Sequence, residues 1–390
     1  MSESSGMDEN SAAGRAMKAL RTDNPEEAVK ALLEALREDP DRIDLMHALA
    51  VTQIRRGHPR DALAITTRGE ELARAQGDRS AAMMLPQFLL ARAAAFEDLY
   101  DPDGAKRSFM SILEHEPQNP RARQGLGHLL LGWGQTSEGL EHLQTYLADA
   151  QDEPDFLRGT QDFVDALQAL IQKDIHPKEF LLAHRGSYVE FFNHHAHRME
   201  AEGWIAEASR MMRNDEGEVV PVIPDGARPY AAIRVDLVNP ETGQPGQIGD
   251  QPMVVALAGY EPLAQAPVLI SWPERDHPFP VLGCTQCPWD QLPAQVAFET
   301  SDHDPVELLD PIIGDWYRAG YDGEFGSRTE GRLHTISDPE ELGPDAVLYH
   351  VDLGRAEFQA IQDLLRRLLV LHDRHPIRCV VLGRGYLPES

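Results

Sequence analysis

The spacing of apolar residues changes once along the chain, close to residue 225. Before this point, apolar residues recur at helical intervals, and residues 177–213 predict one or two helices with breaks at Gly186 and Gly203. Their apolar stripe follows a 7-4-7 spacing through Leu181, Tyr188, Phe192 and Met199. After residue 225, proline and glycine become frequent and β-branched runs appear. This change predicts a second domain that contains a sheet.

Several segments of the second domain carry a specific expectation. Residues 231–239 alternate apolar and charged positions, which predicts a strand with one buried face, and the apolar runs 253–260 and 268–272 predict two more strands. Residues 239–251 predict a loop. The proline-rich stretch 273–293 has no regular period and predicts a long loop.

The last fifty residues predict a strand, a helix and a second strand. The strands cover residues 346–354 and 376–385, and the amphipathic helix between them covers residues 355–372. Such a unit forms a right-handed crossover with parallel strands. Ligands of such sheets bind at the carboxyl ends of the strands, where Arg355 and Arg384 could attract an anion, although ordinary turns explain the neighbouring glycines as well.

Short blocks recur at a nearly fixed interval in the first part of the chain. Each block begins with a polar residue, which is followed in most blocks by a proline, and ends with a small residue. The small residues are 34, 43 and 34 positions apart. They are Ala28, Ala62, Ala105 and Gly139. The nine extra residues of the second interval predict lengthened helices around a loop at 76–78. Residues 154–172 continue the helical pattern, and we expect a capping helix there.

This register resembles the tetratricopeptide repeat family over roughly residues 9–153. The spacing of the small residues matches the family more closely than the residue types at its other positions do. The resemblance implies pairs of antiparallel helices that cross at small residues and end at prolines. It also implies binding of a protein or peptide in an inner groove, for which the candidate side chains here are Arg55, Arg92 and Arg123. The repeats could instead hold two copies together or support the C-terminal domain.

Cysteine and histidine supply the candidate chemistry. Cys284 and Cys287 have the spacing of a metal knuckle or a redox pair, and His277 and Cys379 are candidate further ligands for zinc. The default interpretation is that they are incidental loop cysteines. His194 and His197 lie three residues apart on one predicted helix face. His350 and Asp352 share one face of a predicted strand, a pattern that non-haem iron sites also use.

Composition narrows the classes of partner. Acidic residues outnumber basic ones by 64 to 36, for a formal charge of −28, which disfavours nucleic acid. Three cysteines do not make a disulfide framework, the acidic N-terminus lacks the pattern of a signal peptide, and no apolar run is long enough to cross a membrane. These features predict a cytoplasmic protein.

The sequence therefore predicts a multidomain chain in which an all-α, tetratricopeptide-like superhelix precedes a mixed α/β or α+β domain. The expected parts are a disordered acidic tail at 1–12, a solenoid with its capping helix at 13–175, a helical connector at 176–225 and the second domain at 226–390. The function we expect is that of an adaptor without a cofactor. The alternative is a metal- or thiol-dependent enzyme whose protein substrate is recruited by the repeats.

Overall fold

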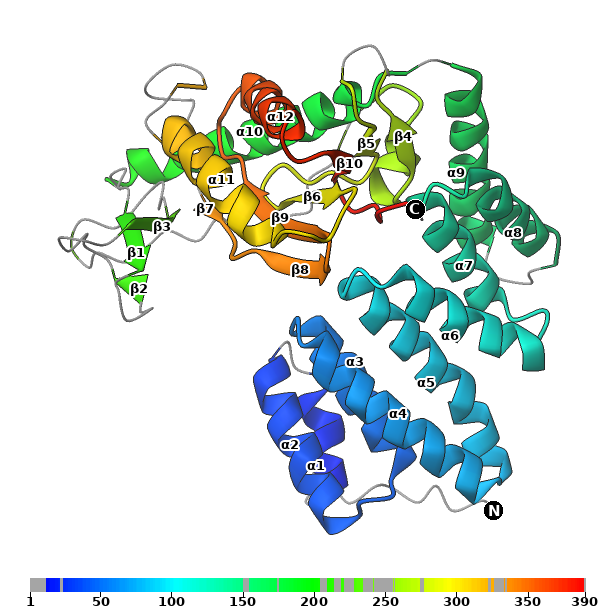
Figure 1. Cartoon of the computed structure of the whole chain (residues 1–390). Coiled ribbons are helices and arrows are strands. Elements are labelled where there is room, and N and C mark those ends of the chain that lie inside the picture. Colours follow the sequence, from blue (N-terminus) through cyan, green and yellow to red (C-terminus); the bar gives the residue numbers. More distant parts are fainter. Residues whose placement is uncertain are drawn as a thin grey trace. The chain divides into compact units, whose positions relative to one another are not determined.

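The computed structural model describes most of the chain (Figure 1). The described residues are 12–21, 24–149, 154–173, 175–203, 209–213, 219–220, 228–233, 241, 255, 257–273, 277–321, 324–325, 333 and 335–388. The predicted acidic tail, apart from residue 12, and the predicted loop at 239–251, apart from residue 241, lie outside them. The chain divides into two compact units, one of residues 1–130 and 137–153 and the other of residues 131–136 and 154–390.

The first unit is built from consecutive helices (Figure 1). Their bounds are α1 Ala12–Ala19, α2 Pro25–Glu38, α3 Ile43–Arg55, α4 Pro59–Gln76, α5 Arg79–Asp98, α6 Pro102–His115, α7 Pro120–Gly132 and α8 Thr136–Asp149. The last two residues of α7, its link to α8 and the first residue of α8 (residues 131–136) belong to the second unit. The predicted all-α repeat region is confirmed.

The recurring sequence blocks mark the starts of helices. Proline is the first residue of α2, α4 and α6, where its missing amide hydrogen costs nothing. The side chains of Asn24 and Asp101 each accept a hydrogen bond from a first-turn amide, at 3.2 and 2.8 Å. The predicted loop at 76–78 is also confirmed, because Gly77 ends α4 with φ 63° and Asp78 caps α5.

Small residues allow the helices to pack closely. Ala62 and Ala105 are fully buried, and Gly125 of α7 lies against the ring of Phe109 of α6. Helix α3 also contacts α5 beyond the intervening α4, and His47 meets Phe88 edge to face with ring centroids 5.7 Å apart. Contacts between the first helices of successive pairs are what a stacked repeat array requires.

The second unit begins with two helices and a small sheet. Helix α9 spans Pro154–Gln172 and α10 spans Lys178–Ala201. Strands β1 Ser209–Arg213, β2 Val219–Val220 and β3 Arg228–Ile233 form an antiparallel sheet in the order β2-β1-β3.

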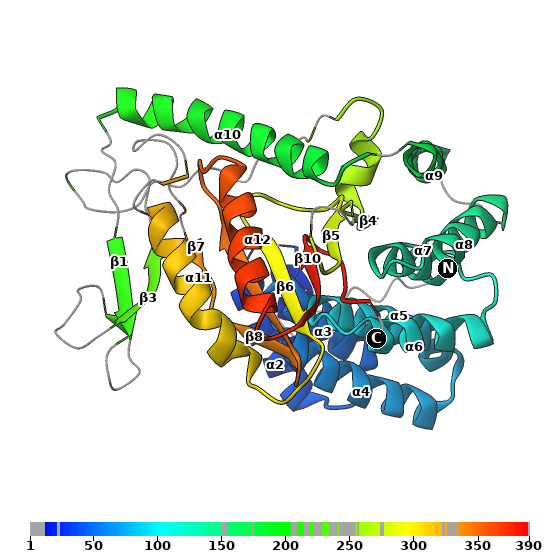
Figure 2. The same ribbon diagram turned by 45° about the horizontal axis from the view of Figure 1, so that its top comes forward.

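The larger sheet of this unit is mixed and carries the core. Its strands are β4 Leu269–Ser271, β5 Val281–Cys284, β6 Leu292–Phe298, β7 Thr335–Ile336, β8 Glu340–Gly343, β9 Ala346–Asp352 and β10 Ile377–Leu382. Their order is β4-β5-β10-β6-β9-β7, with β8 paired to β9. Helices α11 Pro305–Tyr321 and α12 Gln359–His372 lie side by side over the sheet (Figure 2), joined where the Trp316 indole donates to the Ala360 carbonyl at 2.9 Å. The predicted α/β second domain is confirmed.

The predicted strand-helix-strand unit corresponds to β9, α12 and β10. The two strands run parallel to each other, because both pair antiparallel with β6, which lies between them. The parallel neighbour of β10 is β5. Helix α12 begins at Gln359, four residues after the predicted start, because residues 354–358 form turns.

Other local predictions were wrong. Helix α10 continues through Gly186, where a side chain would meet open space, and residues 209–213 form a strand. In the described part of 253–260 there is a turn followed by a short 3₁₀ helix, η1 Glu261–Gln265, because Gly259 has φ 81° and Pro262 cannot donate to a ladder. The stretch 273–293 contains β5 and the start of β6.

Candidate functional site

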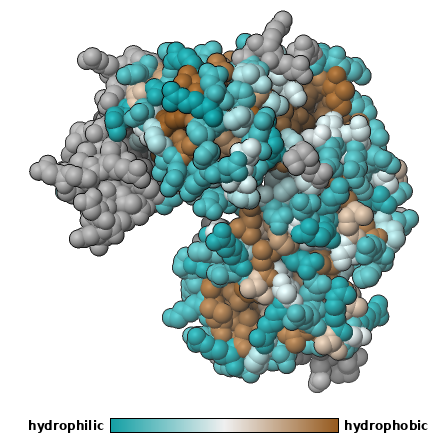
Figure 3. Space-filling model, in the orientation of Figure 1, coloured by the Kyte–Doolittle hydropathy of each residue, from teal (hydrophilic) through white to brown (hydrophobic). Residues whose placement is uncertain are grey.

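The first helices of the repeat pairs present an exposed face. On α3, Asp44, Val51 and Arg55 are exposed at a spacing of seven and four residues, which places them on one side of the helix. On the adjacent α5, Met83 is 63% exposed. Figure 3 shows apolar residues gathered around α2 and α3 on an otherwise largely polar face of the first unit. Exposed apolar positions on stacked helices offer area for another protein.

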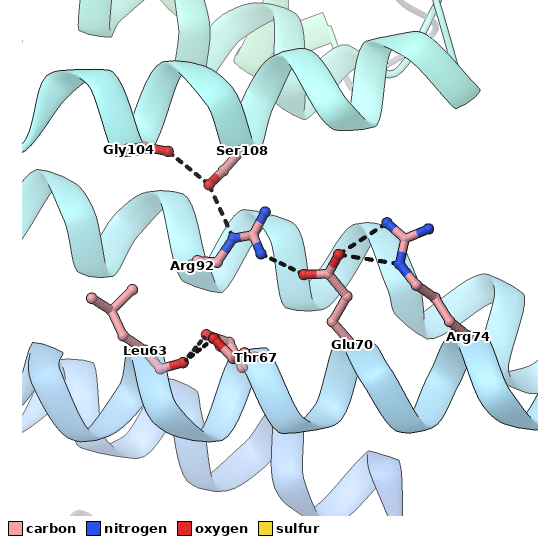
Figure 4. A network of polar contacts seen from close by, with 8 residues as sticks. Leu63, Thr67, Glu70, Arg74, Arg92, Gly104 and Ser108 are labelled. Carbon is pink, nitrogen blue, oxygen red and sulfur yellow. Dashed lines mark hydrogen bonds and ion pairs between the residues drawn. The ribbon is translucent and has the colours of Figure 1, made fainter.

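Arg92, a predicted groove residue, holds three helices together (Figure 4). Its guanidinium pairs with Glu70 of α4, and its Nε donates to the Ser108 hydroxyl of α6 at 3.2 Å. Ser108 donates in turn to the Gly104 carbonyl at 2.8 Å, and Arg74 binds the same Glu70 carboxylate at 2.9 Å. The charge of Arg92 is therefore compensated within the helix array.

The other two groove candidates differ in their surroundings. Arg55 is exposed near the end of α3, beside Val51 on the same face. Arg123 donates from Nε and Nη2 to the Pro117 carbonyl at 3.1 and 2.7 Å, and so ties α7 to the turn that precedes it. Of the three, Arg55 is the one whose side chain extends from the first-helix face toward solvent.

In the second unit, β5 and β10 run parallel and end side by side. Gly383 follows β10 with φ 110°, and a side chain there would meet Cys284 Cβ at 2.7 Å and the Gln286 carbonyl oxygen at 2.9 Å. The next amide, of Arg384, donates to that Gln286 carbonyl at 2.8 Å. The two loops therefore hold each other at the edge of the sheet where ligands bind in α/β folds.

A cavity of about 320 Å³ opens at this edge. It receives polar side chains from α10, η1 and both loops, and two of its walls are the buried Val255 and Ala264. The polar lining consists of His184, Glu261, Gln265, Gln286 and Arg384. The volume lies at the low end of the range for small-molecule sites. The structure thus places the predicted ligand residue Arg384 in a cavity.

His184 is the buried polar group of this cavity. It is 6% exposed, and its Nε2 lies 3.0 Å from the Thr285 carbonyl oxygen. A carbonyl only accepts, so Nε2 carries the proton and Nδ1 is left as an acceptor. Burial lowers the pKa of His184, although the Thr285 hydrogen bond opposes this shift, and the imidazole is neutral at pH 7.

The sequence analysis did not select His184, Glu261 or Gln286. The signal for His184 was present, because it lies three residues after Leu181 and four before Tyr188, both buried on the inward stripe of α10. A polar residue on such a stripe is buried and needs a partner. Glu261 begins the short helix η1 and Gln286 lies in the loop after β5, and nothing local distinguishes them.

Arg355 lies apart from the residues that line the cavity. Its guanidinium carbon stands 5.0 Å from the centre of the Phe192 ring, a cation–π contact with α10. Nearby, Arg185 of α10 donates to the Ala356 carbonyl and to Glu357 at 2.8 and 2.7 Å. In this arrangement both arginines fasten α10 to the segment that leads into α12.

The cysteines are buried and protonated. Cys284 and Cys287 both lie against Gly383, whereas Cys379 packs with Ala297 and Ala346 in a separate apolar cluster. Burial raises the pKa of Cys284 to about 11 and that of Cys287 well above its ordinary value, which makes thiolate chemistry at neutral pH unfavourable.

The candidate metal ligands are only partly brought together. His277 stacks on Phe279 at 5.8 Å. Among the residues that the structure describes, no three histidine, cysteine or acidic side chains are arranged to hold a metal ion. His194 and His197 are exposed on α10, and they too form no such group with a third described ligand. The zinc site that the cysteine spacing allows stays a prediction.

Comparison with known proteins agrees with the helix array. Residues 98–160 match the tetratricopeptide repeat family. The helices that precede this match are also repeat-like, which is consistent with that family. Tetratricopeptide repeats generally bind proteins or peptides. No curated protein matches the chain. None of the helices in the described segments is both long and apolar enough to cross a membrane.

Proposed function

We propose that this chain is a cytoplasmic adaptor that binds a protein or peptide partner through its tetratricopeptide repeats. The observation that carries the proposal is the repeat array itself, with α3 stacked directly on α5 and capped helices starting at the first and third sequence blocks. Such an array has a large surface relative to its volume, which suits it to recognising an extended partner.

The exposed side chains indicate where the partner binds. Val51 is 37% exposed and Met83 63% exposed, and they lie on the first helices of consecutive repeat pairs. Arg55 is exposed one turn beyond Val51 on α3. Apolar contact with a charged rim is the usual composition of a protein interface. Arg92 and Arg123 are instead engaged in hydrogen bonds within the repeats.

Glutamate substitutions test this assignment, since a buried charge in an interface is costly. The variant Met83→Glu is compared with Met110→Glu, because Met110 is an exposed methionine on α6, the second helix of the same pair. Proteins retained by the immobilised full chain are identified by mass spectrometry. We expect Met83→Glu to lose the specific partner and Met110→Glu to keep it. Equal retention by both variants would overturn the proposed surface.

A further inference from the structure

The cavity of the second unit contains an arginine with no ion pair to any residue in the described segments. Arg384 is exposed, and its one hydrogen bond is made by its backbone amide to Gln286. Burial raises the pKa of the Asp290 carboxyl group, and the Arg384 guanidinium opposes this rise, but it makes no ion-pair contact with that group. The planar guanidinium is suited to binding a carboxylate through two parallel hydrogen bonds.

The same cavity offers acceptors for a positively charged group. Glu261, in the first turn of η1, is half-buried and forms no ion pair with another described residue. His184 presents Nδ1 as an acceptor, because its other ring nitrogen is bound to the Thr285 carbonyl. A carboxylate and a neutral imidazole are ligands for an ammonium group, whereas neither favours a second anion.

The size and the remaining walls restrict the ligand further. A volume of about 320 Å³ lies at the low end of the range for small-molecule sites and suits a compact ligand. Val255 and Ala264 give an apolar wall, and Gln265 and Gln286 add amide groups. One cation, one anion and a small apolar wall complement a compact molecule that carries both a carboxylate and an ammonium group.

We propose that this cavity binds a free α-amino acid. Its carboxylate binds Arg384, and its ammonium group binds Glu261 and His184. Arg384 and Gln286 come from loops that are held together at Gly383, so the backbone that carries both side chains is positioned before the ligand arrives. This proposal is independent of the partner-binding role of the repeats, since every residue in it belongs to the second unit.

Titration calorimetry of the full chain with the proteinogenic L-amino acids tests the proposal. The amino acid that binds most tightly is then compared with the amine formed by its decarboxylation and with its N-acetyl derivative. We expect one or more amino acids to bind and both derivatives to bind at least about tenfold more weakly, because each lacks one of the two charges. If no amino acid binds, the proposal is overturned. Equal binding of the amine or of the N-acetyl derivative would also overturn it.

Variants assign the binding to this cavity. Arg384→Gln and Glu261→Gln each remove one charge and are expected to weaken binding about tenfold or more. Arg374→Gln is the matched control, because Arg374 is an exposed arginine at the end of α12 and is not among the cavity residues. It should bind as the wild-type protein does. Unchanged binding by Arg384→Gln, in a variant with wild-type circular dichroism, would contradict the proposal.

Discussion

The carboxylate of Glu70 on α4 pairs with the guanidinium of Arg92 on α5, and this pair is less exposed than the ion pair that Glu70 makes within its own helix. The side chains of Glu70 and Arg92 are 15% and 23% exposed, whereas that of Arg74 is 48% exposed. Arg92 also reaches Ser108 on α6. Three consecutive repeat helices are therefore joined through one arginine.

This arrangement predicts unequal effects of two arginine substitutions. Arg92→Ala removes a partly buried ion pair and leaves Ser108 without its donor, and we expect it to lower the free energy of unfolding by about 1–2 kcal/mol. Arg74→Ala removes an exposed pair within one helix and should cost under about 0.5 kcal/mol. Urea unfolding of both variants measures the difference. Similar losses in the two would show that Arg92 does not link the helices.

Two helical glycines provide a test of packing. A methyl group at Gly69 would overlap the ring of Phe88, whereas one at Gly186 would meet nothing within 4 Å. Gly69→Ala should therefore destabilise the protein by about 1–3 kcal/mol despite the better helix propensity of alanine. Gly186→Ala should leave stability unchanged or raise it by up to about 1 kcal/mol. Thermal unfolding of the two variants measures their stabilities. A Gly69→Ala variant more stable than the wild-type protein would refute the close contact of α4 with α5.

The pH dependence of stability should contain a contribution from Glu97. Burial, with a smaller effect of the Asp98 charge, raises the pKa of Glu97 to about 7 from its ordinary 4.5. The folded state thus holds this proton more tightly than the unfolded state. Its stabilising contribution is complete below pH 4.5 and is lost as the pH rises through 7, by at most about 3 kcal/mol.

The substitution Glu97→Gln isolates this contribution, because glutamine does not titrate. The variant should gain stability relative to the wild-type protein between pH 4.5 and pH 7, and keep that gain at higher pH. Urea unfolding of both proteins on either side of this interval measures the change. A constant difference between the two proteins across the interval would show that Glu97 ionises normally.

The buried thiols predict slow chemical modification. Cys284, Cys287 and Cys379 are buried, and burial raises the pKa of each. A thiol-specific reagent should therefore react with none of them in the folded chain near neutral pH and with all of them after denaturation. Rapid reaction in the absence of denaturant would contradict this account and favour the thiol-dependent alternative.

The repeat region could be predicted from sequence because its determinants are local. The starts of α2 and α6 each combine a capping side chain, a proline and a small residue within five positions, as at Asn24 and Ala28. Strand β5 could not be predicted in this way. It has four residues, Val281–Cys284, and its existence depends on pairing with β10, which is distant in sequence.

The cavity shows the same limit. The sequence located Arg384 at the end of a strand, since an apolar run followed by glycine marks that point. It gave no means to find Glu261 or Gln286, which approach Arg384 only when η1 and the loop after β5 are placed by the sheet. Likewise, the periodicity assigned Arg92 to a helix but contained no sign that Glu70 would lie opposite it.

The central claim is that another protein binds the first-helix face of the repeats. Site-specific photo-crosslinking tests it most directly, with a photoreactive residue placed at Met83 in one variant and at Met110 in the other, each in the full chain in living cells. The account predicts a crosslink to a different protein from position 83 and none to that protein from position 110. Crosslinks to that protein from position 110 alone, or crosslinks from position 83 only to a second copy of this chain, would contradict it.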